Sequence, residues 1–200
     1  MQDLKIEGIG TIAGSEYGNV LTDGVVTCSG DLKAETIRTD GIFTCNGSIV
    51  AERLDCDGVA TVKGDIQAKK ICIDGVLTVS GGTKIEATEI LCDGLIKLNG
   101  QISADRIDAD GNIDALEIVG DRISIQSHYR KWFFPCRSRI ELIEATTVDL
   151  RGVEAKAVNG KDVTIGNGCR VESIDCSGTL RVARDARVGT VTGQYTRADY

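Results

Sequence analysis

A repeated unit along the first half of the chain constrains the fold more than any other feature. An acidic residue followed by glycine marks each unit, and the steps between successive marker glycines are 16, 17, 17, 17, 19 and 17. The marker glycines are Gly8, Gly24, Gly41, Gly58, Gly75, Gly94 and Gly111. A second glycine follows six positions after each of the first six. A short, constant period of this kind indicates a solenoid of stacked coils.

Equivalent positions of the unit form apolar columns. One column follows the marker glycine directly and holds Ile9, Val25, Ile42, Val59, Val76 and Leu95; others hold Ile12, Cys28, Cys45, Val62, Val79 and Leu98, or Leu32, Ile49, Ile66, Ile85 and Ile102. Apolar and polar residues alternate in runs such as 25–28, which is the period of a strand. We therefore expect an all-β, single-stranded parallel β-helix of about 17-residue coils, with every apolar column facing inward.

The clarity of the repeat divides the chain into four regions. Regular coils are expected over residues 1–119 and freer coils over 147–193, where glycines still punctuate aliphatic residues. Residues 120–146 break the pattern with aromatic and basic side chains, so we predict an irregular interruption there. Residues 194–200 are expected to form a short polar tail.

Composition and charge restrict where such a chain works. It has no run of about 18 apolar residues that could span a membrane, and its first residues lack the pattern of a signal peptide. We expect a cytoplasmic protein whose eight cysteines are reduced thiols. Residues 1–120 carry 10 basic and 20 acidic side chains, whereas residues 121–200 carry 13 and 10, and this asymmetry could orient neighbouring subunits.

The unit from Asp40 to Leu54 reads Asp-Gly-Ile-Phe-Thr-Cys-Asn-Gly-Ser-Ile-Val-Ala-Glu-Arg-Leu. This pattern resembles the bactofilins, a family of bacterial polymer-forming cytoskeletal proteins, over residues 7–119 and more loosely over 147–193. The resemblance implies a right-handed β-helix that polymerises without nucleotide through its terminal coils. It also implies a role as a scaffold in cell shape, envelope organisation or motility. The interruption departs from the family pattern.

The strand edges at the two ends of a β-helix invite pairing with another chain. We therefore expect homopolymers or homo-oligomers that form through apolar residues of the first and last coils. The candidate residues are Leu4, Ile6, Ile9, Ile12, Leu180, Val182, Val188 and Val191. The alternative is a monomeric or small-oligomer binding module that recruits a partner protein.

Aromatic and basic side chains cluster within the interruption. They are Tyr129, Arg130, Lys131, Trp132, Phe133 and Phe134. Such a cluster is typical of a cap on the solenoid, of a partner-protein contact or, more weakly, of a membrane-surface contact. Nucleic acid is not expected as a partner, because the chain has a net charge of −7.

We expect no catalytic site, cofactor or metal. The chief enzymatic alternative is a left-handed β-helix acyltransferase with a histidine base, but that class has a hexapeptide period and His128 is the only histidine here. Cys28 and Cys45 share an apolar column, which favours simple packing over a thiol site. Turn formation explains the Asp-Gly column better than calcium binding, because the nonapeptide of calcium β-rolls is absent.

Overall fold

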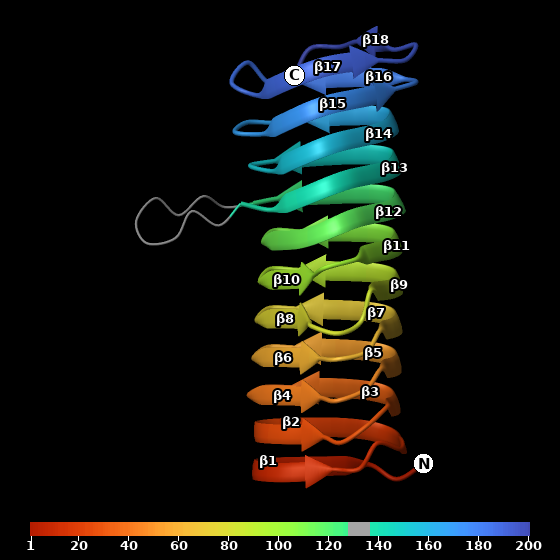
Figure 1. The fold of residues 1–200 in the computed structure, drawn as a ribbon, viewed down its shortest axis with the longest axis vertical. Coiled ribbons are helices and arrows are strands. Elements are labelled where there is room, and N and C mark those ends of the chain that lie inside the picture. Colours follow the sequence, from red (N-terminus) through yellow and green to blue (C-terminus); the bar gives the residue numbers. More distant parts are fainter. Residues whose placement is uncertain (128–136) are drawn as a thin grey trace.

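The computed structural model describes residues 1–127 and 137–200 as one tall column of parallel strands (Figure 1). Within these ranges all the regular secondary structure is β-strand. The described residues contain no helix long and apolar enough to cross a membrane. The strands are β1 (Leu4–Ile12), β2 (Glu16–Cys28), β3 (Leu32–Thr39), β4 (Ile42–Cys45), β5 (Ile49–Cys56), β6 (Val59–Val62), β7 (Ile66–Ile73), β8 (Val76–Val79), β9 (Lys84–Cys92), β10 (Leu95–Leu98), β11 (Gln101–Ala109), β12 (Asn112–Gln126), β13 (Arg139–Arg151), β14 (Glu154–Ile165), β15 (Arg170–Cys176), β16 (Thr179–Val182), β17 (Arg187–Thr192) and β18 (Thr196–Arg197).

Each strand pairs in parallel with the equivalent strand of the next coil. Leu54 of β5 lies over Ile37 of β3, one coil earlier, and below Ile71 of β7, one coil later. The chain stacks about 11 such coils, with a spacing of about 17 along the sequence. The prediction of an all-β parallel solenoid with this coil length is confirmed.

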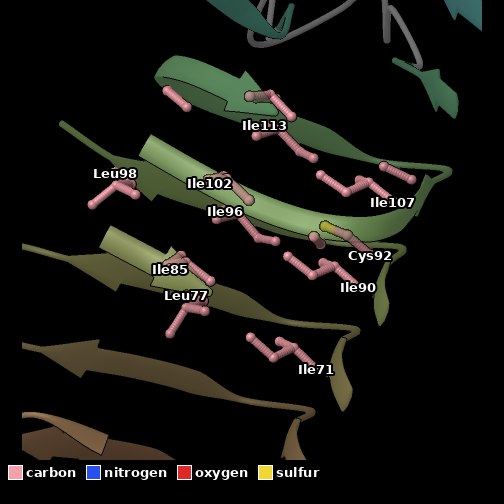
Figure 2. Packing of buried hydrophobic residues seen from close by; sticks show 14 of the residues in the cluster. Ile71, Leu77, Ile85, Ile90, Cys92, Ile96, Leu98, Ile102, Ile107 and Ile113 are labelled. Atoms are coloured by element: carbon pink, nitrogen blue, oxygen red, sulfur yellow. The ribbon is translucent and has the colours of Figure 1, made fainter. Parts of the chain in front are cut away.

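The core is a set of vertical ladders inside the column. In Figure 2 the isoleucines Ile71, Ile90 and Ile107 stack above one another, and Leu77, Ile96 and Ile113 form a second ladder beside them. All of these side chains are fully buried. Branched aliphatic residues favour this stacking, because their restricted rotamers already suit a strand and each covers the residue on the next rung.

The column of apolar residues that follows the marker glycines was wrongly predicted to face the interior of the β-helix. Ile9, Val25, Ile42 and Val59, the residues after the marker glycines, are 90%, 42%, 50% and 43% exposed, so they face outward. The strand alternation instead buries the next position, as Phe43 and Ala60 show. That inward column ranges in size from Gly10 to Phe43, so the sequence did not mark it as a single apolar column.

The marker glycines are required chiefly because successive turns stack closely. A Cβ added to Gly58 would overlap the carbonyl oxygen of Gly41 directly below it, and Gly75 would meet Gly58 in the same way. In the series from Gly8 to Gly111, only Gly8 and Gly24 have a positive φ. The turn therefore needs glycine for its small size at most coils and for its backbone freedom at two.

The predicted interruption at residues 120–146 and the predicted tail at residues 194–200 both include residues that form paired strands. β12 and β13 cover residues 112–126 and 139–151 and pair in register, so most of the segment 120–146 belongs to the solenoid. The middle coils are shorter: Ile123 lies over Ile107 and Val163 lies over Val148, which are steps of 16 and 15 along the sequence. These shorter steps hid the repeat. The last coils return to a step of 17, as Val188 over Val171 shows. In the tail, β18 pairs with β16.

Candidate functional site

The first coil exposes a strand edge and two aliphatic side chains. β1 pairs with β2 on one side and with no other strand of residues 1–127 and 137–200. Leu4 and Ile6 occupy inward positions under Val20 and Thr22, which are both buried, yet they remain half-buried themselves. They are exposed because this structure places no rung beneath them. The result is an unpaired backbone edge beside partly covered apolar surface, which favours strand pairing with another molecule.

The last coil is less apolar. Val188 and Val191 lie over the buried residues Val171 and Ile174 and are half-buried. On the neighbouring face, Arg197 lies directly over Leu180, so a charged residue ends an otherwise apolar ladder. A backbone hydrogen bond from the Ala198 N–H to the Leu180 carbonyl, 3.0 Å long, holds this segment in place. The two ends of the column therefore differ in chemistry.

The structure places the eight predicted assembly residues in three different environments. Leu4 and Ile6 lie at one end of the column, and Val182, Val188 and Val191 lie at the other (Figure 1). Ile12 and Leu180 are core residues, exposed by 5% and 0%, and were assigned wrongly to the end surfaces. Ile9 faces outward on the side wall, because it belongs to the outward column after the marker glycines.

The predicted aromatic and basic cluster Tyr129, Arg130, Lys131, Trp132, Phe133 and Phe134 lies outside the described residues, as does His128. The described residues on either side form a hydrogen-bonded corner. The Ser127 and Ser138 hydroxyls are 2.6 Å apart, and the buried Ser138 oxygen accepts the Ile113 N–H at 2.8 Å. This corner replaces the Asp-Gly turn of the coil below.

The described cysteines are suited to packing. Six of the seven are buried free thiols, and the Cys28 and Cys45 Sγ atoms both donate to the Gly30 carbonyl at 3.3 Å. Burial raises the pKa of Cys45 to about 11 and that of Cys92 to about 12. A protonated buried thiol is a poor nucleophile and a poor metal ligand. Among the described residues, no three histidine, cysteine or acidic side chains gather as a metal site.

The aspartates before the marker glycines stack into an acidic ladder along one corner of the column. Asp57, Asp74 and Asp93 occupy successive coils. Partial burial of Asp74 and the negative charges of Asp57 and Asp93 raise the pKa of the Asp74 carboxyl. Arg38 pairs with Asp57 at 3.1 Å. This corner therefore carries a concentrated negative charge.

A groove on the upper side wall was not predicted from the sequence. It has a volume of about 1340 Å³ and runs along one corner of the column over many coils. The buried residues Ala115, Ile140, Ala155 and Val171 lie along its floor. Its rim carries charged residues of successive coils, which are Lys97, Asp114, Arg139, Glu154, Arg170 and Arg187. The shape of this groove depends on the lengths of the later coils, and the irregular repeat in the second half of the sequence did not reveal those lengths.

Comparison with known proteins gave no match to a family model, to a curated protein or to a solved structure.

Proposed function

We propose that this protein is a non-catalytic structural protein that associates end to end through its terminal coils and serves as a scaffold for other proteins. The observation that carries the proposal is the first coil, where the unpaired edge of β1 lies beside the half-buried side chains of Leu4 and Ile6. The bactofilin-like repeat adds support, since that resemblance implies polymerisation without nucleotide. The implied roles in cell shape, envelope organisation or motility belong to the same proposal.

Hydrophobic burial and backbone pairing supply the driving force for this contact. Complete burial of an aliphatic side chain stabilises by about 1.5–3 kcal/mol, so covering the exposed half of Leu4 and Ile6 contributes about 1 kcal/mol each. The backbone groups on the edge of β1 add hydrogen bonds worth about 1 kcal/mol each. The nine-residue length of β1 gives this edge several such groups.

The test is a charged substitution at the end of the column. Ile6→Asp places a carboxylate in the contact, and we expect it to raise the concentration needed for assembly by more than about tenfold, which corresponds to about 1.4 kcal/mol. Val50→Asp is the matched control, because Val50 is 42% exposed on the side wall in β5, away from both ends. Sedimentation velocity and negative-stain electron microscopy measure the assemblies. Equal assembly by wild type and Ile6→Asp contradicts the proposal.

A further inference from the structure

The strands that follow the marker glycines present two neutral outward columns side by side over the lower coils. One column is aliphatic and the other consists of threonines, because outward positions of a strand lie two residues apart. They hold Ile9, Val25, Ile42, Val59, Val76 and Leu95, and Thr11, Thr27, Thr44, Thr61 and Thr78. We call this surface the aliphatic–threonine face. Four of its aliphatic side chains are more than 40% exposed, and Ile9 is 90% exposed. An aliphatic column exposed on four successive coils indicates a contact surface, since outward positions of an exposed sheet usually carry polar residues.

The two edges of this face carry complementary groups on the same coils. Along one edge, two positions before each aliphatic residue, runs the acidic ladder, with Asp23, Asp40, Asp57, Asp74 and Asp93. Along the other edge, six positions after each aspartate, lies an exposed side chain that donates hydrogen bonds. These donors are Ser29, Asn46, Lys63, Ser80 and Asn99. Each of them can donate to a carboxylate, so the face is complementary to itself on every one of these coils.

A second copy of the chain matches this pattern in one orientation. Rotation by half a turn about an axis parallel to the column, opposite Ala60, brings Asp57 of one copy against Lys63 of the other and Val59 against Thr61. The equivalent pairs of the other coils follow at the rung spacing of about 4.8 Å. Columns that run in opposite directions would instead place aspartate against aspartate, and like charges repel.

The acidic ladder gains from donors that a partner supplies. Burial and the neighbouring aspartates raise the pKa of Asp74, so the stacked carboxylates repel one another within a single copy. Asp57 pairs with Arg38 through Oδ2 at 3.1 Å, which leaves its Oδ1 atom for Lys63 of a second copy. The rung-by-rung match therefore survives the one ion pair that already occupies this edge.

The size of the face fits a small specific interface. Six coils at the rung spacing measure about 29 Å, and the six residue steps from aspartate to donor measure about 20 Å. Contact over this area covers about 600 Å² on each copy and about 1,200 Å² in total, which is the lower end of the range for specific complexes. The half-turn also keeps the strands of the two sheets aligned, as in other sheets that pack face to face.

We propose that two copies of this chain pack side by side through the aliphatic–threonine face, about a two-fold axis parallel to the column. The face lies on the side wall along β4, β6 and β8, away from the column ends (Figure 1). Both copies use the same surface, so the contact is isologous and closes at a dimer. This side contact is separate from the end contact of the proposed function, and it keeps both first coils at the same end of the pair.

Substitutions in an Ile6→Asp parent test the side contact without the end contact. Sedimentation velocity over a concentration series gives the dissociation constant of each dimer. We expect the parent to dimerise and Val59→Asp to weaken the dimer by about tenfold or more, because each interface then buries two additional carboxylates among apolar side chains. Val50→Asp is the matched control, since Val50 is 42% exposed in β5, which pairs with β3 and β7 on a different face. This control should dimerise as the parent does.

A charge exchange tests the orientation of the two copies. Lys63→Glu places a second carboxylate against Asp57 at two symmetric positions of the dimer, and Asp57→Lys places a second ammonium group against Lys63. We expect each variant alone to dimerise several-fold more weakly than the parent. An equimolar mixture restores an attractive pair at both positions and should form heterodimers about as tight as the parent dimer.

Three results overturn the proposal: a monomeric parent, parent-like dimerisation of Val59→Asp, or a mixture that associates no more tightly than its two components. Ile42→Asp takes the place of Val59→Asp if the latter loses its β-type circular dichroism. Failure of the end contact has a different signature, since Ile6→Asp would then leave the wild-type assemblies unchanged.

Discussion

Replacing one marker glycine by alanine tests whether the turns are stacked as tightly as the structure shows. The Cβ of Gly58→Ala would overlap the Gly41 carbonyl oxygen, which accepts the Val59 N–H at 2.7 Å. Relief of the overlap requires the two turns to separate. The separation lengthens or breaks that hydrogen bond, at about 1 kcal/mol, and disturbs the packing beside it, at about 1–3 kcal/mol.

The expected total is about 2–4 kcal/mol of unfolding free energy, which corresponds to a decrease of about 4–16 °C in Tm for a chain of this size. Gly30→Ala is the control, because its Cβ would have the Gly14 Cα as nearest neighbour at an ordinary 3.7 Å. We expect Gly30→Ala to be neutral or slightly stabilising, since alanine restricts the unfolded chain. Thermal and urea unfolding followed by far-UV circular dichroism measure both. Equal stability of the two variants would refute the stacked-turn account.

Three further predictions concern single side chains. Ser138→Ala leaves the buried Ile113 N–H without its acceptor, so urea titration should show a loss of about 1–3 kcal/mol, and wild-type stability would contradict this. The raised pKa of Asp74 means that its ionised form destabilises the folded state; Asp74→Asn should therefore be more stable at pH 7 by up to about 0.5 kcal/mol, a gain that disappears as the pH falls through the carboxyl pKa. Brief alkylation with peptide mapping should label half-exposed Cys72 well before Cys45 and Cys92, and equal labelling would argue against their burial.

Sequence periodicity was sufficient to predict the coil but not the side of the wall on which each residue lies. Columns such as Ile37, Leu54 and Ile71 keep one size class, so their inward position was evident. The residue after each marker glycine is equally aliphatic yet faces outward, because the period of a strand fixes alternation and leaves its phase open. Which of two adjacent strand positions faces inward can be judged only when the residues at both positions are compared across all the coils.

The candidate sites were predicted less well, for reasons that depend on three-dimensional register. Leu180 looked terminal by its sequence position, but the pairing of β18 over β16 buries it. The groove was missed because it lies along one corner of the column over many coils, and no single residue signals it. Leu4 and Ile6 lie in the first strand, at an end of the column, and their role in assembly stays a prediction.

The paired serines at Ser127 and Ser138 have a consequence for how such a column can diversify. β12 and β13 meet in register on either side of this corner, although the segment 128–136 stands between them in the sequence. Extra peptide at this position therefore leaves the interior ladders undisturbed. The corner is a permissive grafting point, at which a rod of fixed girth can acquire new recognition sequences while its interior stays the same.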